Sequence, residues 1–250
     1  MSDEKHVRLH FKNPPIMEAV IAVTISELPE AVVCDLGDAK DELATLGFEV
    51  QLPRHRHEFQ IKVEEGVSSF AGKDMPYGFQ YFRRDRSFAV QFLRNGFIFS
   101  QLGNYTSWEE FTQAARQVWS VYVRILGAIE LDSFNVRYIN KLFLPELQPW
   151  QDFIKIYPFI PEEVPQEISE LFMRISMPIQ SPPGRLSHQQ VMLPPEREGF
   201  ATVILDNDFQ FSAIGTPMSS LWKRIEEVRE LKNDYFDKFL TSKMKDQFNA

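Results

Sequence analysis

The chain has 250 residues, of which 44% are hydrophobic and 25% are charged, a balance typical of a globular protein with a full hydrophobic core. Its net charge of −8 disfavours a nonspecific grip on nucleic acid or on an anionic membrane. We expect a cytoplasmic protein, because no apolar run could span a bilayer, the first residues lack the apolar stretch of a signal peptide, and Cys34 is the only cysteine.

The first half of the chain is predicted to contain a strand, a helix, four strands and a second helix. In chain order these are a strand at 16–26, a helix at 32–46, strands at 58–64 and 77–84, a hairpin at 88–102 and a helix between Ser107 and Gly127. The dipeptide Asn95-Gly96 is a strong turn signal for the hairpin. Ser107 and Glu110 form a capping box at the start of the second helix, whose predicted apolar stripe is Trp108, Phe111, Ala115, Val118, Tyr122 and Ile125.

The second half is predicted to repeat this order. Its elements are a strand at 134–144, a short helix at 150–157, strands at 170–179 and 185–193, a hairpin at 200–214 and a helix at 221–239. The second hairpin is expected to turn on Asn207-Asp208. A loop rich in proline and glutamate covers 158–168.

Two segments of sixteen residues support an internal duplication. Residues 88–103 and 200–215 align without a gap and are identical at eight positions. We therefore predict an α+β fold made of two β-α-β-β-β-β-α units in tandem, at 7–130 and 131–250, with an antiparallel sheet and long helices on one face.

The two predicted hairpins also suggest which face of the sheet the helices cover. Phe92 is expected to face Phe99, and Ile204 to face Phe211, on the helix side. The opposite face is less polar than a solvated face should be. Its residues are Ala89, Leu93, Ile98 and Leu102 around Gln91 and Ser100, and Ala201, Leu205 and Ile214 around Gln210 and Ser212. Either a ligand, a partner chain or the other half covers this face, or long neighbouring side chains do.

Two short motifs carry a resemblance to a known family. Asn13-Pro14-Pro15-Ile16-Met17-Glu18-Ala19-Val20 has the pattern N-x-P-I-x-E-A-V, and Arg137-Tyr138-Ile139-Asn140 follows in mid-chain. With these motifs the chain resembles a sporadically distributed prokaryotic family of uncharacterised proteins of this length. The family has no established activity, so the resemblance implies no catalytic residue.

The predicted order of elements is also similar to that of known folds. It resembles one half of the TATA-box-binding fold, itself a tandem duplication, and the helix-grip carriers of apolar ligands use a related layout. Such a likeness implies an architecture and transfers no function.

The first strands of the two predicted halves each carry polar residues. Glu18 lies in one, and Arg137, Tyr138 and Asn140 lie in the other. An acid within an apolar strand needs a partner, which Arg137 could supply through a bidentate bond. The pair could be a polar anchor at the centre of a binding surface, or a structural ion pair that fixes how the halves meet.

Two further clusters have simpler explanations. His55 and His57 could face the same way, but zinc usually takes three or four ligands, so a solvated surface is favoured over a metal site. Arginines at 54, 56, 83, 84, 86 and 94 alternate with Phe79, Tyr81 and Phe82, as in proteins that bind single-stranded nucleic acid. The acidic chain makes nucleic-acid binding the less favoured interpretation.

The sequence contains no catalytic signature. Ser187 and His188 are adjacent in a strand and so point to opposite faces, and turn chemistry accounts for Asp206 and Asp208. We expect a non-catalytic module that needs no cofactor or metal, binds an unknown protein or small molecule, and could form a homodimer. The alternative is an enzyme with a site near Glu18 and Arg137. The candidate ligand-binding residues are Glu18, Arg137, Tyr138, Asn140, Gln91 and Ser100.

Overall fold

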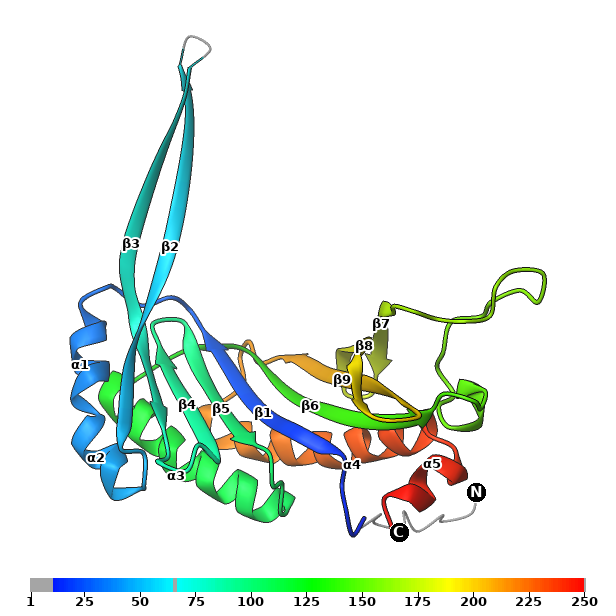
Figure 1. Cartoon of the computed structure of the whole chain (residues 1–250). Coiled ribbons are helices and arrows are strands. Elements are labelled where there is room, and N and C mark those ends of the chain that lie inside the picture. The colour runs from blue at the N-terminus through cyan, green and yellow to red at the C-terminus, as the bar shows by residue number, and fades with distance from the viewer. Residues whose placement is uncertain (1–10, 65–66, 250) are drawn as a thin grey trace. The chain divides into compact units, whose positions relative to one another are not determined.

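The computed structural model describes residues 11–64 and 67–249, and it confirms an α+β fold (Figure 1). The strands are β1 (Ile16–Ile25), β2 (Val50–Glu64), β3 (Val67–Phe82), β4 (Phe88–Leu93), β5 (Gly96–Leu102), β6 (Leu131–Pro145), β7 (Phe172–Gln180), β8 (Pro183–Arg197) and β9 (Phe200–Ser212). The helices are α1 (Val32–Asp38), α2 (Lys40–Thr45), α3 (Trp108–Leu126), α4 (Leu221–Phe239) and α5 (Ser242–Gln247), with 3-10 turns η1 (Trp150–Asp152) and η2 (Met218–Ser220).

The nine strands form one antiparallel sheet in the order β2-β3-β4-β5-β1-β6-β9-β8-β7. The chain divides into two compact units. Unit 2 contains residues 20–135 and 212–218, and unit 1 contains the described residues up to Ala19 together with 136–211 and 219–249. Among the described residues, no helix combines the length and the apolar character needed to cross a bilayer.

The core of unit 2 is a cluster of aromatic side chains between the sheet and α3. Phe97 contacts Trp119, Phe99 contacts Phe111, and all four side chains are buried. The start of α3 follows the predicted cap, because the Ser107 hydroxyl accepts a hydrogen bond from the Glu110 amide at 3.1 Å. The apolar stripe predicted for this helix faces the sheet, since most of its residues are buried and Phe111 contacts Phe99 of β5.

The β4–β5 hairpin is present, but its predicted register is wrong. Phe92 pairs with Phe97 instead of Phe99, and the turn residues are Arg94 and Asn95. The end of β1 and the residues just after it impose this turn, because the Ile25 and Leu28 amides donate to the carbonyls of Asn95 and Arg94, each at 2.9 Å. Phe92 and Phe99 still share the helix side of the sheet, as the sequence predicted.

The second predicted hairpin, at 200–214, is absent. Residues 200–212 form the single strand β9, in which Asn207 and Asp208 pair with His188 and Ser187 of β8. Without a turn, the alternation of faces continues through the strand, so Leu205 lies in the hydrophobic core and not on the helix-free side. Ala201 is likewise buried. The tandem duplication itself stays a prediction.

The strands β2 and β3 extend beyond the rest of the sheet as a two-stranded ribbon (Figure 1). Their pairing runs from Val50 opposite Phe82 to Glu64 opposite Val67, with a bulge between Arg54 and His55. By contrast, β4 pairs only with residues 78–82 of β3. Both strands are longer than the sequence predicted, because pairing within the ribbon continues where the sheet ends.

The core of unit 1 lies between the sheet and the C-terminal helices. Its buried residues are Leu142, Leu144, Phe153, Ile154, Val203, Leu205, Leu240, Met244 and Phe248. The long predicted helix α4 is confirmed, whereas the short helix expected at 150–157 is only the 3-10 turn η1. Helix α5, which the sequence did not predict, completes this core through Met244.

Candidate functional site

Among the described residues, the helices of unit 2 pack on one face of its sheet, and we call the opposite face the open face. Tyr81, Phe97 and Phe99 point to the helices, since Tyr81 donates to the Leu36 carbonyl of α1 and the two phenylalanines contact α3. Because successive residues of a strand alternate, their neighbours point the other way. The open face consists of Val50, Leu52, Arg54, Gly78, Gln80, Phe82, Ala89, Gln91, Leu93, Ile98, Ser100 and Leu102.

The open face is largely apolar, with small buried residues between larger ones. Ala89, Leu93 and Ser100 are buried, whereas Gln91 and Ile98 are half-buried. Part of this face is therefore shielded from solvent. Leu52 remains 44% exposed at its margin. The side-chain amides of Gln80 and Gln91 and the hydroxyl of Ser100 are the polar groups in the middle of the open face.

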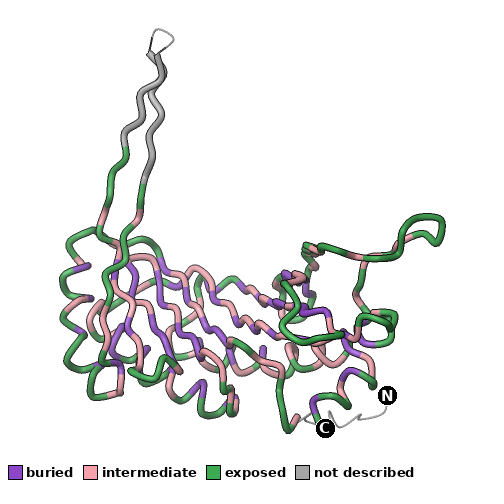
Figure 2. The backbone as a smooth tube through the Cα atoms, in the orientation of Figure 1, coloured by how far each residue is buried: buried purple, intermediate pink, exposed green. Residues whose placement is uncertain are grey.

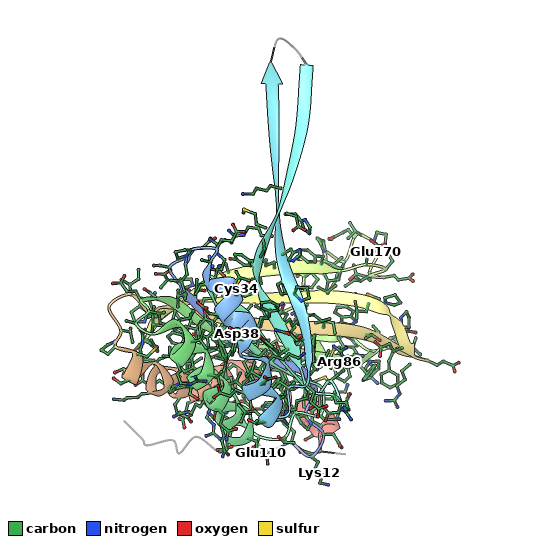
Figure 3. The ribbon with its side chains drawn as sticks, turned by 90° about the vertical axis from the view of Figure 1, so that its left-hand side faces the viewer. Lys12, Cys34, Asp38, Arg86, Glu110 and Glu170 are labelled. Atoms are coloured by element: carbon green, nitrogen blue, oxygen red, sulfur yellow. The ribbon has the colours of Figure 1, made fainter. Side chains whose placement is uncertain are left out.

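Arginines border the open face, and none of the residues that form it is acidic. Arg54 is an exposed member of the face on the edge strand β2. Arg86 lies at the turn between β3 and β4 and is labelled in Figure 3. Its guanidinium group lies 4.2 Å from the ring centroid of Phe82. A surface with this composition favours a partner that carries apolar and anionic groups.

The other arginines of the basic region are engaged within unit 2. Arg56 and Arg94 both pair with Glu27, and Arg56 also donates to the Tyr77 hydroxyl. Among the turn arginines, Arg84 pairs with Glu49 at 2.5 Å. Tyr81 is fully buried and cannot stack on a base. These contacts leave few groups for the nucleic-acid binding that the sequence suggested as an alternative.

In unit 1, the side chain of Arg137 forms a bidentate ion pair with Asp206. Arg137 Nε and Nη2 donate to Asp206 Oδ1 and Oδ2 at 2.7 and 2.6 Å, and Gln189 donates to Oδ2 at 3.1 Å. These bonds to Asp206 raise the pKa of Arg137. The expected partner, Glu18, contributes only a weaker electrostatic interaction. The arrangement resembles a structural ion pair in a strand ladder more than an open binding site.

Tyr138 and Asn140 do not join Arg137, because they lie on the other face of β6. Asn140 donates to the backbone carbonyls of Tyr138 and Leu205, both at 3.4 Å, and is buried. The ammonium group of Lys232, on α4, lies 4.0 Å from the ring centroid of Tyr138. Burial lowers the pKa of Lys232 to about 7. The predicted anchor residues thus belong to two different surroundings in unit 1, while Gln91 and Ser100 belong to unit 2.

His188 is a buried polar residue whose surroundings the sequence did not reveal. Its Nδ1 lies 2.7 Å from Asn207 Oδ1 and its Nε2 lies 3.0 Å from Gln190 Nε2. An amide oxygen on one side and an amide nitrogen on the other suit a neutral imidazole that donates through Nδ1. Ser187 points to the opposite face and contacts Arg174, so the predicted separation of Ser187 and His188 is confirmed.

Burial lowers the pKa of His188 below its ordinary value of 6.5, which makes stability depend on pH. The unfolded chain binds a proton at His188 more readily than the folded chain does. The contribution of neutral His188 to the free energy of unfolding is therefore complete above pH 6.5 and is lost as the pH falls below that value. We expect the urea midpoint to fall between about pH 6.5 and 5.5, and to fall less in His188→Gln. Equal slopes in the two proteins, measured by circular dichroism, would contradict this assignment.

His55 and His57 lie on the same face of the ribbon, as predicted, and share one acidic neighbour. Asp74, on the adjacent strand β3, lies 3.0 Å from His55 Nδ1 and 3.5 Å from His57 Nδ1. All three side chains are well exposed. Within the described part of the chain, no cluster of three or more histidine, cysteine or acidic side chains could hold a metal ion.

Sequence reasoning missed Asp206 as the partner of Arg137, and Gln189 as a second side-chain donor to Asp206. Asp206 was assigned to a turn, yet it is a buried acid in an apolar strand, which is the signal that should have required a cation. Its partner could be found only from the order and register of β6, β9 and β8.

Comparison with known proteins adds no further assignment. No model of a protein family matches the chain, and no curated protein matches its sequence.

Proposed function

We propose that the chain is a non-catalytic binding module of the cytosol and that its partner docks on the open face of unit 2. The observation that supports this most is an apolar sheet face, without helices of its own unit, bordered by arginines and free of acidic residues. Apolar surface drives association, and the arginines select the charge of the partner.

The chemistry of the open face defines the partner's class. Ile98, Leu52 and Leu102 offer apolar contact, and Gln91 can donate and accept hydrogen bonds. Arg54 and Arg86 favour carboxylate or other anionic groups at the margin. A peptide segment or small molecule that combines apolar and anionic groups fits these requirements.

The alternative of an enzyme near Glu18 and Arg137 has less support. The two Arg137 nitrogens that could clamp a substrate carboxylate already bind Asp206. The carboxylate of Glu18 has no hydrogen-bonded base or nucleophile among the described residues, and a catalytic group needs such a neighbour. We therefore assign Arg137 and Asp206 a structural role.

The proposal is tested with 1-anilinonaphthalene-8-sulfonate, an apolar dye with one negative charge. We expect saturable binding to the native protein, about tenfold weaker in Leu52→Asp and in Arg54→Glu. Both side chains are exposed, so the fold should survive, which circular dichroism checks.

The matched control is Ile214→Asp, which changes a side chain that is 78% exposed and lies outside the open face. This variant should bind the dye as the unmodified protein does. Dye binding that is absent, or unchanged by Leu52→Asp and Arg54→Glu, would refute the proposal.

A further inference from the structure

Residues 157–172 of unit 1, which we call the acidic segment, expose large apolar side chains. Phe159 is 85% and Phe172 71% exposed, and Tyr157 and Val164 are also exposed. In Figure 2 most residues of this segment are coloured as exposed. Among residues 11–57 and 72–249, eight large apolar side chains are exposed, and four of them are here. Such a concentration marks an interaction surface.

All the charges of this segment have one sign. Glu162, Glu163, Glu167 and Glu170 lie within it, and there is no lysine, arginine or histidine from residue 156 to residue 173. Apolar side chains between carboxylates suit an apolar surface with a basic border.

The acidic segment is also restrained before it meets a partner. Pro158, Pro161 and Pro165 limit its backbone. The Gln166 amide donates to the carbonyls of Pro161 and Val164, both at 2.7 Å, and so holds the turn at the tip. A segment held in shape loses less conformational entropy on binding.

We infer that the acidic segment of one copy docks on the open face of unit 2 in a second copy. The inference rests on the proposed function, since it names the partner of that face. Phe159 and Val164 supply apolar contact for Leu52 and its neighbours, and the glutamates supply anions for Arg54 and Arg86. The contact joins two different surfaces, so it is heterologous, and each copy can both give and receive it.

The experiment is sedimentation velocity on the full chain over a range of concentrations. The unmodified protein should associate, and added salt should weaken the association. Phe159→Asp, or Glu162→Lys with Glu163→Lys, damages only the segment, and Arg54→Glu damages only the open face. Each should weaken association about tenfold, while Ile214→Asp should not change it.

Mixing two defective proteins gives the sharper test. A copy with Arg54→Glu retains its segment, and a copy with Glu162→Lys and Glu163→Lys retains its open face. Together they can form one intact contact, so the mixture should associate more strongly than either alone. Cys34 is the single cysteine and an exposed residue of α1 (Figure 3). A dye attached to it in one of the two variants allows the sedimentation of that variant to be followed in the mixture.

The outcomes separate this inference from the proposed function. A monomer at every concentration, or a mixture that associates no better than its components, overturns the inference. If Arg54→Glu still weakens dye binding in that case, the proposed function stands without it. Association that needs the segment, in a protein whose open face binds no dye, overturns the proposed function together with the docking site.

Discussion

Replacing Gly96 by alanine is expected to lower the free energy of unfolding by at least about 3 kcal/mol. A Cβ atom at this position would lie 2.3 Å from the carbonyl oxygen of Val23, in the backbone of β1. Backbone cannot move aside as a flexible side chain can, so β1 and the β4–β5 turn would have to separate. Urea denaturation followed by circular dichroism measures the loss.

Gly103→Ala provides the matched control, because both glycines lie at the ends of β5. Gly103 has a φ of +67° but no atom within 4 Å of the added Cβ. Its substitution should therefore cost about 1 kcal/mol, the penalty of the left-handed conformation alone. Equal losses for the two variants would show that close packing against Val23 is not what requires glycine at position 96.

The second large effect is expected at Arg137. Arg137→Ala should lower the free energy of unfolding by about 2 kcal/mol, because it leaves the carboxylate of Asp206 with Gln189 as its remaining side-chain donor. The value lies below that of a fully buried pair, since the Arg137 side chain is 39% exposed. Thermal or urea unfolding provides the measurement.

Glu18→Gln distinguishes the observed ion pair from the expected one. Glu18 only adds a weak electrostatic interaction with Arg137, so its substitution should change the stability by less than about 0.5 kcal/mol. A loss as large as that of Arg137→Ala would mean that Glu18, and not Asp206, holds the guanidinium group.

Local patterns predicted those parts of the fold that local interactions determine. The capping box at Ser107 and the apolar stripe of α3 depend on contacts within a few residues, and both are confirmed. The turn of the first hairpin is instead set by β1, about 70 residues earlier in the chain, through hydrogen bonds to Arg94 and Asn95. No pattern within residues 88–102 could reveal that constraint.

The second of the two similar sixteen-residue segments, 200–215, shows how similarity of sequence can mislead. Gly96 permits the close approach of β1, whereas the corresponding residue, Asp208, continues a strand opposite Ser187. The predicted turn is also the reason that Asp206 was not recognised as a buried acid, because an aspartate beside a solvated turn needs no cationic partner. The sequence suggested that Arg137 pairs with an acid, and the register of the strands determines that this acid is Asp206.

The ribbon of β2 and β3 has a consequence for how this protein can vary. Of the described residues of β3, those before Gly78 pair only with β2. The length of this part therefore does not affect the pairing of any other strand. Residues can be inserted or removed there in opposing pairs without altering the register of β3 with β4. The length of the ribbon can therefore change, in evolution or by design, while the aromatic core under the sheet stays the same.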